Sequence, residues 1–107
     1  RHPEPAVPDA VVHLVEAMGV AAEKIATKTG VVISTRDTVM AAQVEKDDDE
    51  MDLLHRQLIS ALIAPTWEHG VETAIDLTLL GRYYERYADH AVSVSRRVIF
   101  LVTGKFA

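Results

Sequence analysis

Apolar residues recur every three or four positions along most of the chain, which is the spacing that places them on one side of an α-helix. The first such stretch starts at Asp9, a residue type that caps helix N-termini, and a break is expected near residues 34–37. Its predicted buried positions are Val11, Leu14, Met18, Ala21 and Ile25. The pattern therefore predicts a first amphipathic helix over this region.

The second periodic stretch starts around Asp37 or Thr38 and must end before Pro65, because proline interrupts a helix. Its predicted buried side consists of Met40, Val44, Asp47, Met51, Leu54, Leu58 and Ala61. Residues 65–70 (PTWEHG) have the composition of a turn, and the tryptophan in this turn is expected to cover one end of a core.

The third stretch has the most regular spacing and is predicted to be a helix from Val71 to about Thr103, with Gly104 as the stop signal. Its apolar seam, in a strict three-four alternation, is Leu77, Leu80, Tyr84, Tyr87, Ala91, Val94, Val98 and Leu101. Such an alternation is typical of a helix that packs lengthwise on other helices. We therefore expect this seam to face the core.

Three helices with short connections and one apolar seam each must bury those seams against one another. The predicted fold is all-α, an elongated antiparallel three-helix bundle formed by residues 9–107. Residues 1–8 contain three of the four prolines and are predicted to be a linker.

Composition narrows the possible functions. The chain has 107 residues, no cysteine and a formal net charge of −5, so thiolate sites are excluded and nucleic-acid binding is not expected. Its apolar runs are far shorter than a membrane span requires, so membrane insertion is not expected either. Phosphate loops, nucleophile elbows and zinc-protease helices are absent from the sequence, and we predict no catalytic residues and no enzymatic activity.

Residues 45–52 (EKDDDEMD) carry six carboxylates in eight positions. Like charges at i and i+4 each cost a helix a few tenths of a kcal/mol. Two pairs at this spacing, Asp48 with Asp52 and Glu85 with Asp89, lie on equivalent flanks of the second and third helices. Two interpretations remain open on this evidence: a solvated acidic face, or carboxylates that converge on a hard metal cation. Arg82 and Arg86 could instead neutralise the acids in a salt-bridge network.

Particular motifs resemble the PhoU family. The segment LLGRYYERYADHAVSVSRRVIFLVTG, residues 79–104, is similar to the last helix of a PhoU repeat, with its Glu-x-x-x-Asp pair at Glu85 and Asp89. The segment DDEMDLLHRQL, residues 48–58, is similar to the second-helix motif, with its Asp-x-x-x-Asp pair at Asp48 and Asp52. Together with the Thr-Arg-Asp break at residues 35–37, the resemblance covers almost everything from residue 9 onward.

The resemblance implies metal sites on the paired acids, with iron, zinc, magnesium or manganese as the ion. The implied ligands are Asp48, Asp52, Glu85 and Asp89, and Asp49 and Glu45 are additional candidates. Because PhoU proteins usually carry two such repeats, the chain is expected to be the C-terminal half of a longer protein.

By the same resemblance, the expected function is negative regulation of phosphate uptake and of phosphate-starvation two-component signalling. The expected partners are the ATPase subunit of the phosphate ABC transporter and a phosphate-sensing histidine kinase, with a homodimer as a further option. The expected location is the bacterial cytoplasm, peripheral to the inner face of the membrane through those partners.

Two other classes of protein stay open. One is a metalloenzyme or metal-storage bundle, for which His55, three residues after Asp52, has a suggestive spacing but too few companion ligands. A structural role is therefore expected for His55 and also for His90. The other class is a purely structural oligomerisation module with a solvated acidic face.

Overall fold

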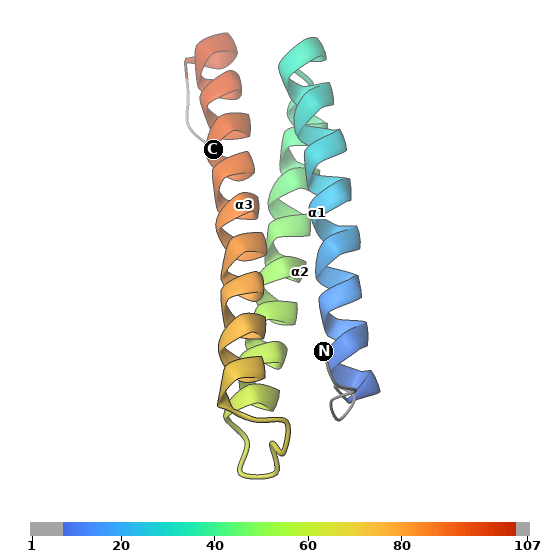
Figure 1. Ribbon diagram of the computed structural model, residues 1–107. Coiled ribbons are helices and arrows are strands. Elements are labelled where there is room, and N and C mark those ends of the chain that lie inside the picture. Colours follow the sequence, from blue (N-terminus) through green and yellow to red (C-terminus); the bar gives the residue numbers. More distant parts are fainter. Residues whose placement is uncertain (1–7, 105–107) are drawn as a thin grey trace.

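The computed structural model describes residues 8–104, which form three α-helices: α1 (Asp9–Thr35), α2 (Thr38–Ile63) and α3 (Val71–Thr103). Figure 1 shows the helices side by side, with α2 running opposite to α1 and α3. The prediction of an all-α, antiparallel three-helix bundle is therefore confirmed. The linker predicted for residues 1–8 lies outside the described residues except for Pro8.

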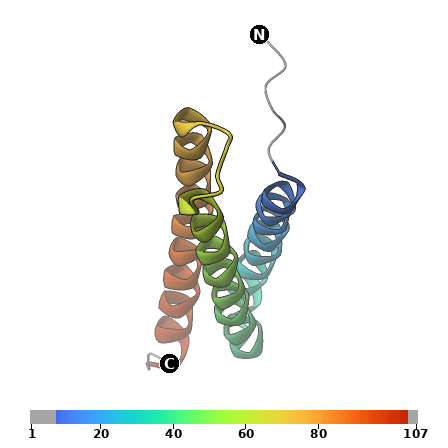
Figure 2. The same ribbon diagram turned by 90° about the horizontal axis from the view of Figure 1, so that it is seen from below.

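The bundle is elongated, measuring 53 × 24 × 17 Å, and each helix contacts both of the others. Viewed along the bundle, α1 and α3 lie on either side of α2 (Figure 2). The core runs along the whole length, and its largest completely buried apolar side chains are Met18, Ile25, Val32, Val44, Met51 and Leu58. The buried positions predicted for the first two helices agree with this core.

The break between α1 and α2 forms where the sequence predicts it. Arg36 adopts a left-handed conformation (φ 59°), and its backbone N–H donates to the Val32 carbonyl to close α1. Asp37 then caps α2, because its carboxylate accepts hydrogen bonds from the N–H groups of Val39 and Met40 at 2.9 and 3.2 Å. The turn is thus closed on both sides by local hydrogen bonds.

The predicted N-cap of α1 is wrong by one residue. Pro8 occupies the capping position, and its carbonyl accepts hydrogen bonds from Val11 and Val12 at 2.9 and 3.1 Å. Asp9 is instead the first helical residue, where its negative charge favours the positive end of the helix dipole.

The predicted seam of α3 is also partly wrong. Leu80, Tyr87 and Leu101 are 36, 38 and 74% exposed. The core side of α3 is rotated by about one residue and buries Gly81, Ala88, Ala91, Val92, Ser95 and Ile99. Small side chains on this side allow α3 to approach α2 closely: a Cβ at Gly81 would lie only 2.8 Å from the Leu58 Cδ2 atom. The larger residues of the regular seam are consequently turned outward.

The connection between α2 and α3 is anchored to the core. Trp67 is half-buried and packs against the core, as predicted, and its indole N–H donates to the Gly70 carbonyl at 2.9 Å. Over residues 8–104, none of the helices combines the length and apolar character that crossing a membrane requires.

Candidate metal centre

Carboxylates from α2 and α3 meet near the middle of the bundle. Asp48 and Asp52 lie one helical turn apart on α2, and Asp89 reaches them from α3. One oxygen from each of these three side chains can be chosen so that all three lie within 4.8 Å of one another. The structure therefore brings together three of the four acids predicted as metal ligands.

Glu85, the fourth predicted ligand, borders this trio from the preceding turn of α3. Burial raises the pKa of Glu85, and a hydrogen bond to Asp89 and the negative charge of Asp89 raise it further. The charge of Asp52 on α2 acts in the same direction, while His55 opposes it. Glu85 thus belongs electrostatically to the acidic cluster, which we define as Asp48, Asp52, Glu85 and Asp89.

Among the acids of the cluster, Asp48 has the pKa that its surroundings raise most clearly. Burial, followed by the charges of Asp52, Asp89, Asp49 and Glu85, raises the pKa of Asp48 to about 6 from the usual 3.8. Its Oδ1 atom is buried and has no hydrogen-bond partner among the described residues. A buried carboxylate oxygen that lacks both a donor and a neighbouring cation is costly, and either a proton or a bound cation relieves this cost.

The acidic run of α2 is divided between two faces of the helix. Asp47 is buried and forms an ion pair of 2.9 Å with Lys28 on α1, as expected from its place on the apolar seam. Glu50 also points to α1, where it meets Lys24 at 3.4 Å. These two acids therefore help to join α2 to α1 and do not belong to the acidic cluster.

The two additional candidate ligands differ in their surroundings. Glu45 accepts two hydrogen bonds from the Arg96 guanidinium, at 2.9 and 3.3 Å, and this arginine lowers the pKa of Glu45. Asp49 is exposed and acts on the cluster through its charge, which helps to raise the pKa of Asp48. Glu45 therefore already has a cationic partner, whereas no ion pair within residues 8–104 holds Asp49 away from the cluster.

Among the described residues, Arg82 and Arg86 do not form the salt-bridge network that was left open as an alternative. Within residues 8–104, neither Arg82 nor Arg86 lies within ion-pair distance of a carboxylate, although both lie near Glu85 and Asp89 on the surface of α3. The cluster is therefore not neutralised by these arginines. Its charge remains concentrated on one face of the α2–α3 pair.

His55 lies beside the acidic cluster. This side chain is half-buried, lies against Gly81 of α3 and acts electrostatically on Glu85. A Cβ atom at Gly81 would lie 3.1 Å from the His55 Cδ2 atom, so the glycine makes room for the imidazole. The sequence shows the three-residue spacing that brings His55 close to Asp52 on α2. It does not show that Gly81 lies opposite His55, because Gly81 belongs to another helix.

The donor set suits a hard cation. Carboxylate oxygens are the preferred ligands of Mg²⁺, Ca²⁺ and Mn²⁺ and are also used by iron and zinc. The convergence of Asp48, Asp52 and Asp89, and the unpartnered oxygen of Asp48, fit such an ion. The side chains present are therefore chemically suited to the metal that the resemblance implied.

Fold and site together define an all-helical bundle with a carboxylate cluster between two of its helices. Residues 15–98 match the PhoU domain family. The chain belongs to the PhoU family.

Individual relatives agree with this assignment. The phosphate-specific transport system accessory protein PhoU homolog 1 of Mycobacterium leprae is 48% identical over 106 residues, covering 99% of this chain and 48% of that protein. PhoU homolog 2 of Mycobacterium tuberculosis (strain ATCC 25618 / H37Rv) is 47% identical, covering 99% of this chain and 50% of that protein. A PhoU homolog of Deinococcus radiodurans is 34% identical over 74 residues, covering 67% of this chain and 35% of that protein. The chain thus spans about half the length of the mycobacterial relatives, and no solved structure matches it significantly.

Proposed function

We propose that this chain is a unit of a negative regulator of phosphate uptake and phosphate-starvation signalling, and that it holds a metal ion between α2 and α3. The observation that carries the regulatory role is membership of the PhoU family, whose mycobacterial members here are named accessory proteins of the phosphate-specific transport system. The acidic cluster supports the metal.

In this proposal Asp48, Asp52 and Asp89 supply the ligand oxygens, with Glu85 and Asp49 at the border. The bound ion would neutralise the mutual repulsion of these acids and join α2 to α3. Asp48 must lose its proton for the ion to bind, because a metal coordinates the carboxylate and competes with the proton. Metal affinity is therefore expected to rise as the pH increases through about 6, the pKa of Asp48.

The proposed partners are the ATPase subunit of the phosphate ABC transporter and the phosphate-sensing histidine kinase, which the chain meets in the bacterial cytoplasm. A rigid bundle of 53 Å presents long faces to such proteins. Binding to both would allow adequate phosphate to keep the kinase from activating its response regulator. The exposed positions of the bundle, and not an enzymatic site, would carry this role.

The metal is tested by elemental analysis of protein purified without chelator and by thermal unfolding with Mn²⁺. At a free concentration of 100 times the dissociation constant, an ion that binds only the folded state stabilises it by about 2.7 kcal/mol. For a domain of this size, this corresponds to a rise in Tm of about 10–20 °C. The variant Asp52→Asn, Glu85→Gln should lose the rise, and Glu50→Gln, which changes an acid facing α1, should retain it. No rise with Mn²⁺ in the unmodified chain, together with no metal found by elemental analysis, would exclude the metal.

The partners are tested by binding assays between this chain and the purified ATPase subunit and kinase of the same organism. Saturable binding of both proteins is expected. If neither binds the chain, with or without Mn²⁺, the regulatory role of this unit is wrong, whatever the result for the metal. Comparing the Asp52→Asn, Glu85→Gln variant with Glu50→Gln in the same assay determines whether partner binding depends on the cluster.

A further inference from the structure

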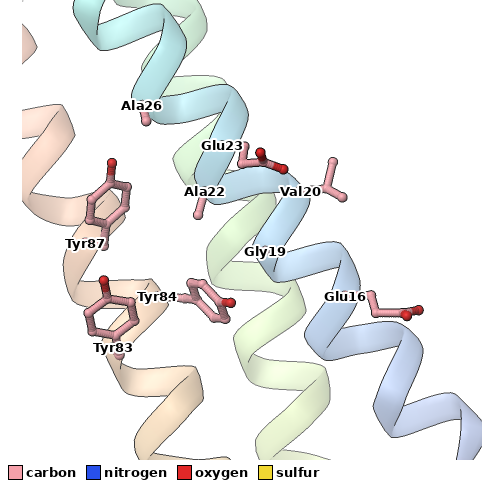
Figure 3. A pocket seen from close by; sticks show the side chains of 9 residues that line it. All are labelled: Glu16, Gly19, Val20, Ala22, Glu23, Ala26, Tyr83, Tyr84 and Tyr87. Carbon is pink, nitrogen blue, oxygen red and sulfur yellow. The ribbon is translucent and has the colours of Figure 1, made fainter.

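An open groove of about 810 Å³ lies between α1 and α3, on the side of the bundle away from α2. Small side chains form its wall on α1, and in Figure 3 Ala22 and Ala26 point towards α3. Tyr84 packs against the core and reaches across from α3, so that its hydroxyl oxygen would lie 3.4 Å from a Cβ at Gly19. The small residues of α1 therefore leave the groove open beside Tyr84.

Two further tyrosines of α3 offer aromatic surface to this groove. Tyr83 is 62% exposed and Tyr87 is 38% exposed. Their rings stack with a centroid distance of 6.4 Å and an interplanar angle of 24°. Stacking orients the two rings without covering them. Tyrosines held in this way are typical of protein–protein interfaces, because they bury a large area at little cost in side-chain entropy.

Among the described residues, the charged side chains that line the groove are both acidic. They are Glu16 and Glu23, on its α1 edge. Glu16 lies 3.3 Å from the exposed imidazole of His13, but no lysine or arginine within residues 8–104 forms an ion pair with either glutamate. The spacing of seven residues places both glutamates on one side of α1, about 10 Å apart. Carboxylates beside exposed tyrosine rings favour a cationic partner, since the face of a tyrosine also attracts guanidinium and ammonium groups.

The position of the groove between two helices determines which shape of partner fits it. The residues that line it on α1, from Glu16 to Ala26, cover about 15 Å along the bundle. An extended peptide would leave backbone N–H and C=O groups without partners against the apolar side chains, whereas a helix satisfies its own. A helix laid along the groove would pack on α1 and α3 as the fourth helix of a bundle.

We propose that this groove binds a basic amphipathic helix of another protein. The apolar side of that helix contacts the tyrosines and the small residues of α1. Lysine or arginine residues seven positions apart on it meet Glu16 and Glu23, and the exposed ring of Tyr83 offers a further cation an aromatic face. The groove lies between α1 and α3, whereas the acidic cluster lies between α2 and α3, so the proposal does not depend on the metal.

Fluorescence anisotropy with a labelled synthetic peptide tests the proposal. The peptide has about 20 residues and forms a helix with leucines on one side and arginines at i and i+7 along one edge of that side. The unmodified chain should bind it saturably. Binding should be at least about tenfold tighter than that of two control peptides, one with glutamines in place of the arginines and one with the same residues in scrambled order. Equal binding of the scrambled peptide, or no saturable binding of the helical peptide, would overturn the proposal.

Variants of the chain test whether the peptide occupies this groove. Tyr83→Ala should weaken binding at least about tenfold, because an exposed tyrosine that becomes buried in an interface contributes much of the affinity. Glu16→Gln, Glu23→Gln should weaken binding about three- to tenfold, and less at high salt. The matched control Glu72→Gln, Asp76→Asn removes the same charge from exposed positions of α3 outside the groove and should leave the dissociation constant unchanged. Equal effects of the two charge variants would show that the peptide is attracted only by the overall negative charge.

A second copy of the chain is the competing occupant of the groove. Sedimentation velocity of the chain, without and with the peptide, distinguishes the two. A monomer that carries one peptide supports the proposal, and a dimer that excludes the peptide would show that another copy covers the groove. All substituted positions are exposed, so the variants are expected to fold, and circular dichroism verifies this.

Discussion

Replacing Asp48 by asparagine should stabilise the metal-free protein at neutral pH, although it removes a group from the candidate site. The pKa of Asp48 is raised to about 6 in the folded state, so the native protein retains a proton that the unfolded chain has already released. The native state consequently binds more protons between about pH 4 and 6, and its stability falls with rising pH in this interval. The contribution of Asp48 is present in full below pH 3.8 and is lost as the pH rises through about 6.

The size of this stabilisation follows from the usual pKa of Asp48 and its pKa in the folded protein. At 1.36 kcal/mol per pKa unit, the difference between 3.8 and about 6 sets an upper limit of about 3 kcal/mol. Water reaches the half-buried Asp48, which screens its charge and reduces this figure to about 1–2 kcal/mol. Asparagine resembles the protonated carboxyl in shape and charge, and therefore avoids the cost of ionisation. At 4–8 °C per kcal/mol, the expected rise in Tm at pH 7 is about 5–15 °C.

The assay is thermal unfolding of the unmodified chain, Asp48→Asn and Asp49→Asn at pH 4 and pH 7, all with chelator. The stabilisation by Asp48→Asn should be present at pH 7 and nearly absent at pH 4. Asp49→Asn changes an exposed neighbour and should have a smaller effect. A destabilised Asp48→Asn at pH 7, or an equal effect at both pH values, would show that repulsion and burial are not what raises the pKa of Asp48. Saturating Mn²⁺ should reverse the order of stability, because asparagine is a weaker ligand.

Two further pairs of substitutions test the packing and the ion pairs of the bundle. Leu58→Ala, at a completely buried position, should lower the free energy of unfolding by about 2–5 kcal/mol in urea titrations, and Leu53→Ala on the surface should change it by less than about 0.5 kcal/mol. Lys28→Met should cost about 1–3 kcal/mol because it leaves the buried carboxylate of Asp47 without its partner, while Lys24→Met, which breaks an exposed pair, should cost less than about 1 kcal/mol. Equal costs for the two lysine variants would contradict a special role for the buried pair.

The sequence predicts the helices well because their signals are local. The Asp37 cap, the break around Arg36 and the stop at Gly104 each depend on backbone preferences of a few adjacent residues. The rotation of α3 about its own axis could not be predicted in this way. It depends on the absence of a side chain at Gly81, opposite Leu58 of another helix, and periodicity alone favours the larger residues of the regular seam.

In the candidate site too, local features could be predicted from the sequence and contacts between helices could not. The spacing of Asp48 with Asp52, and of Glu85 with Asp89, identifies two pairs that each share a flank of one helix. Their meeting across α2 and α3 depends on the register of the bundle. The partners of the remaining charges depend on it too: Arg96 binds Glu45, while the two arginines nearest the cluster bind no acid within residues 8–104. Which ion pairs form between helices depends on how each helix is rotated about its own axis. A rotation of tens of degrees changes the partners, and the sequence composition does not predict this rotation.

The distribution of charge over the three faces links the fold to the proposals. The α1–α2 face uses acids of the 45–52 run for ion pairs, so these acids contribute to holding the bundle together. Between α2 and α3, the charges of Asp52 and Asp89 help to raise the pKa values of Asp48 and Glu85, and the metal-free fold would be more stable without this repulsion. The core of Met18, Ile25 and Leu58 forms without them. A cluster that costs the fold stability and lies outside this core is typical of a binding site, because a proton or a bound cation relieves the repulsion.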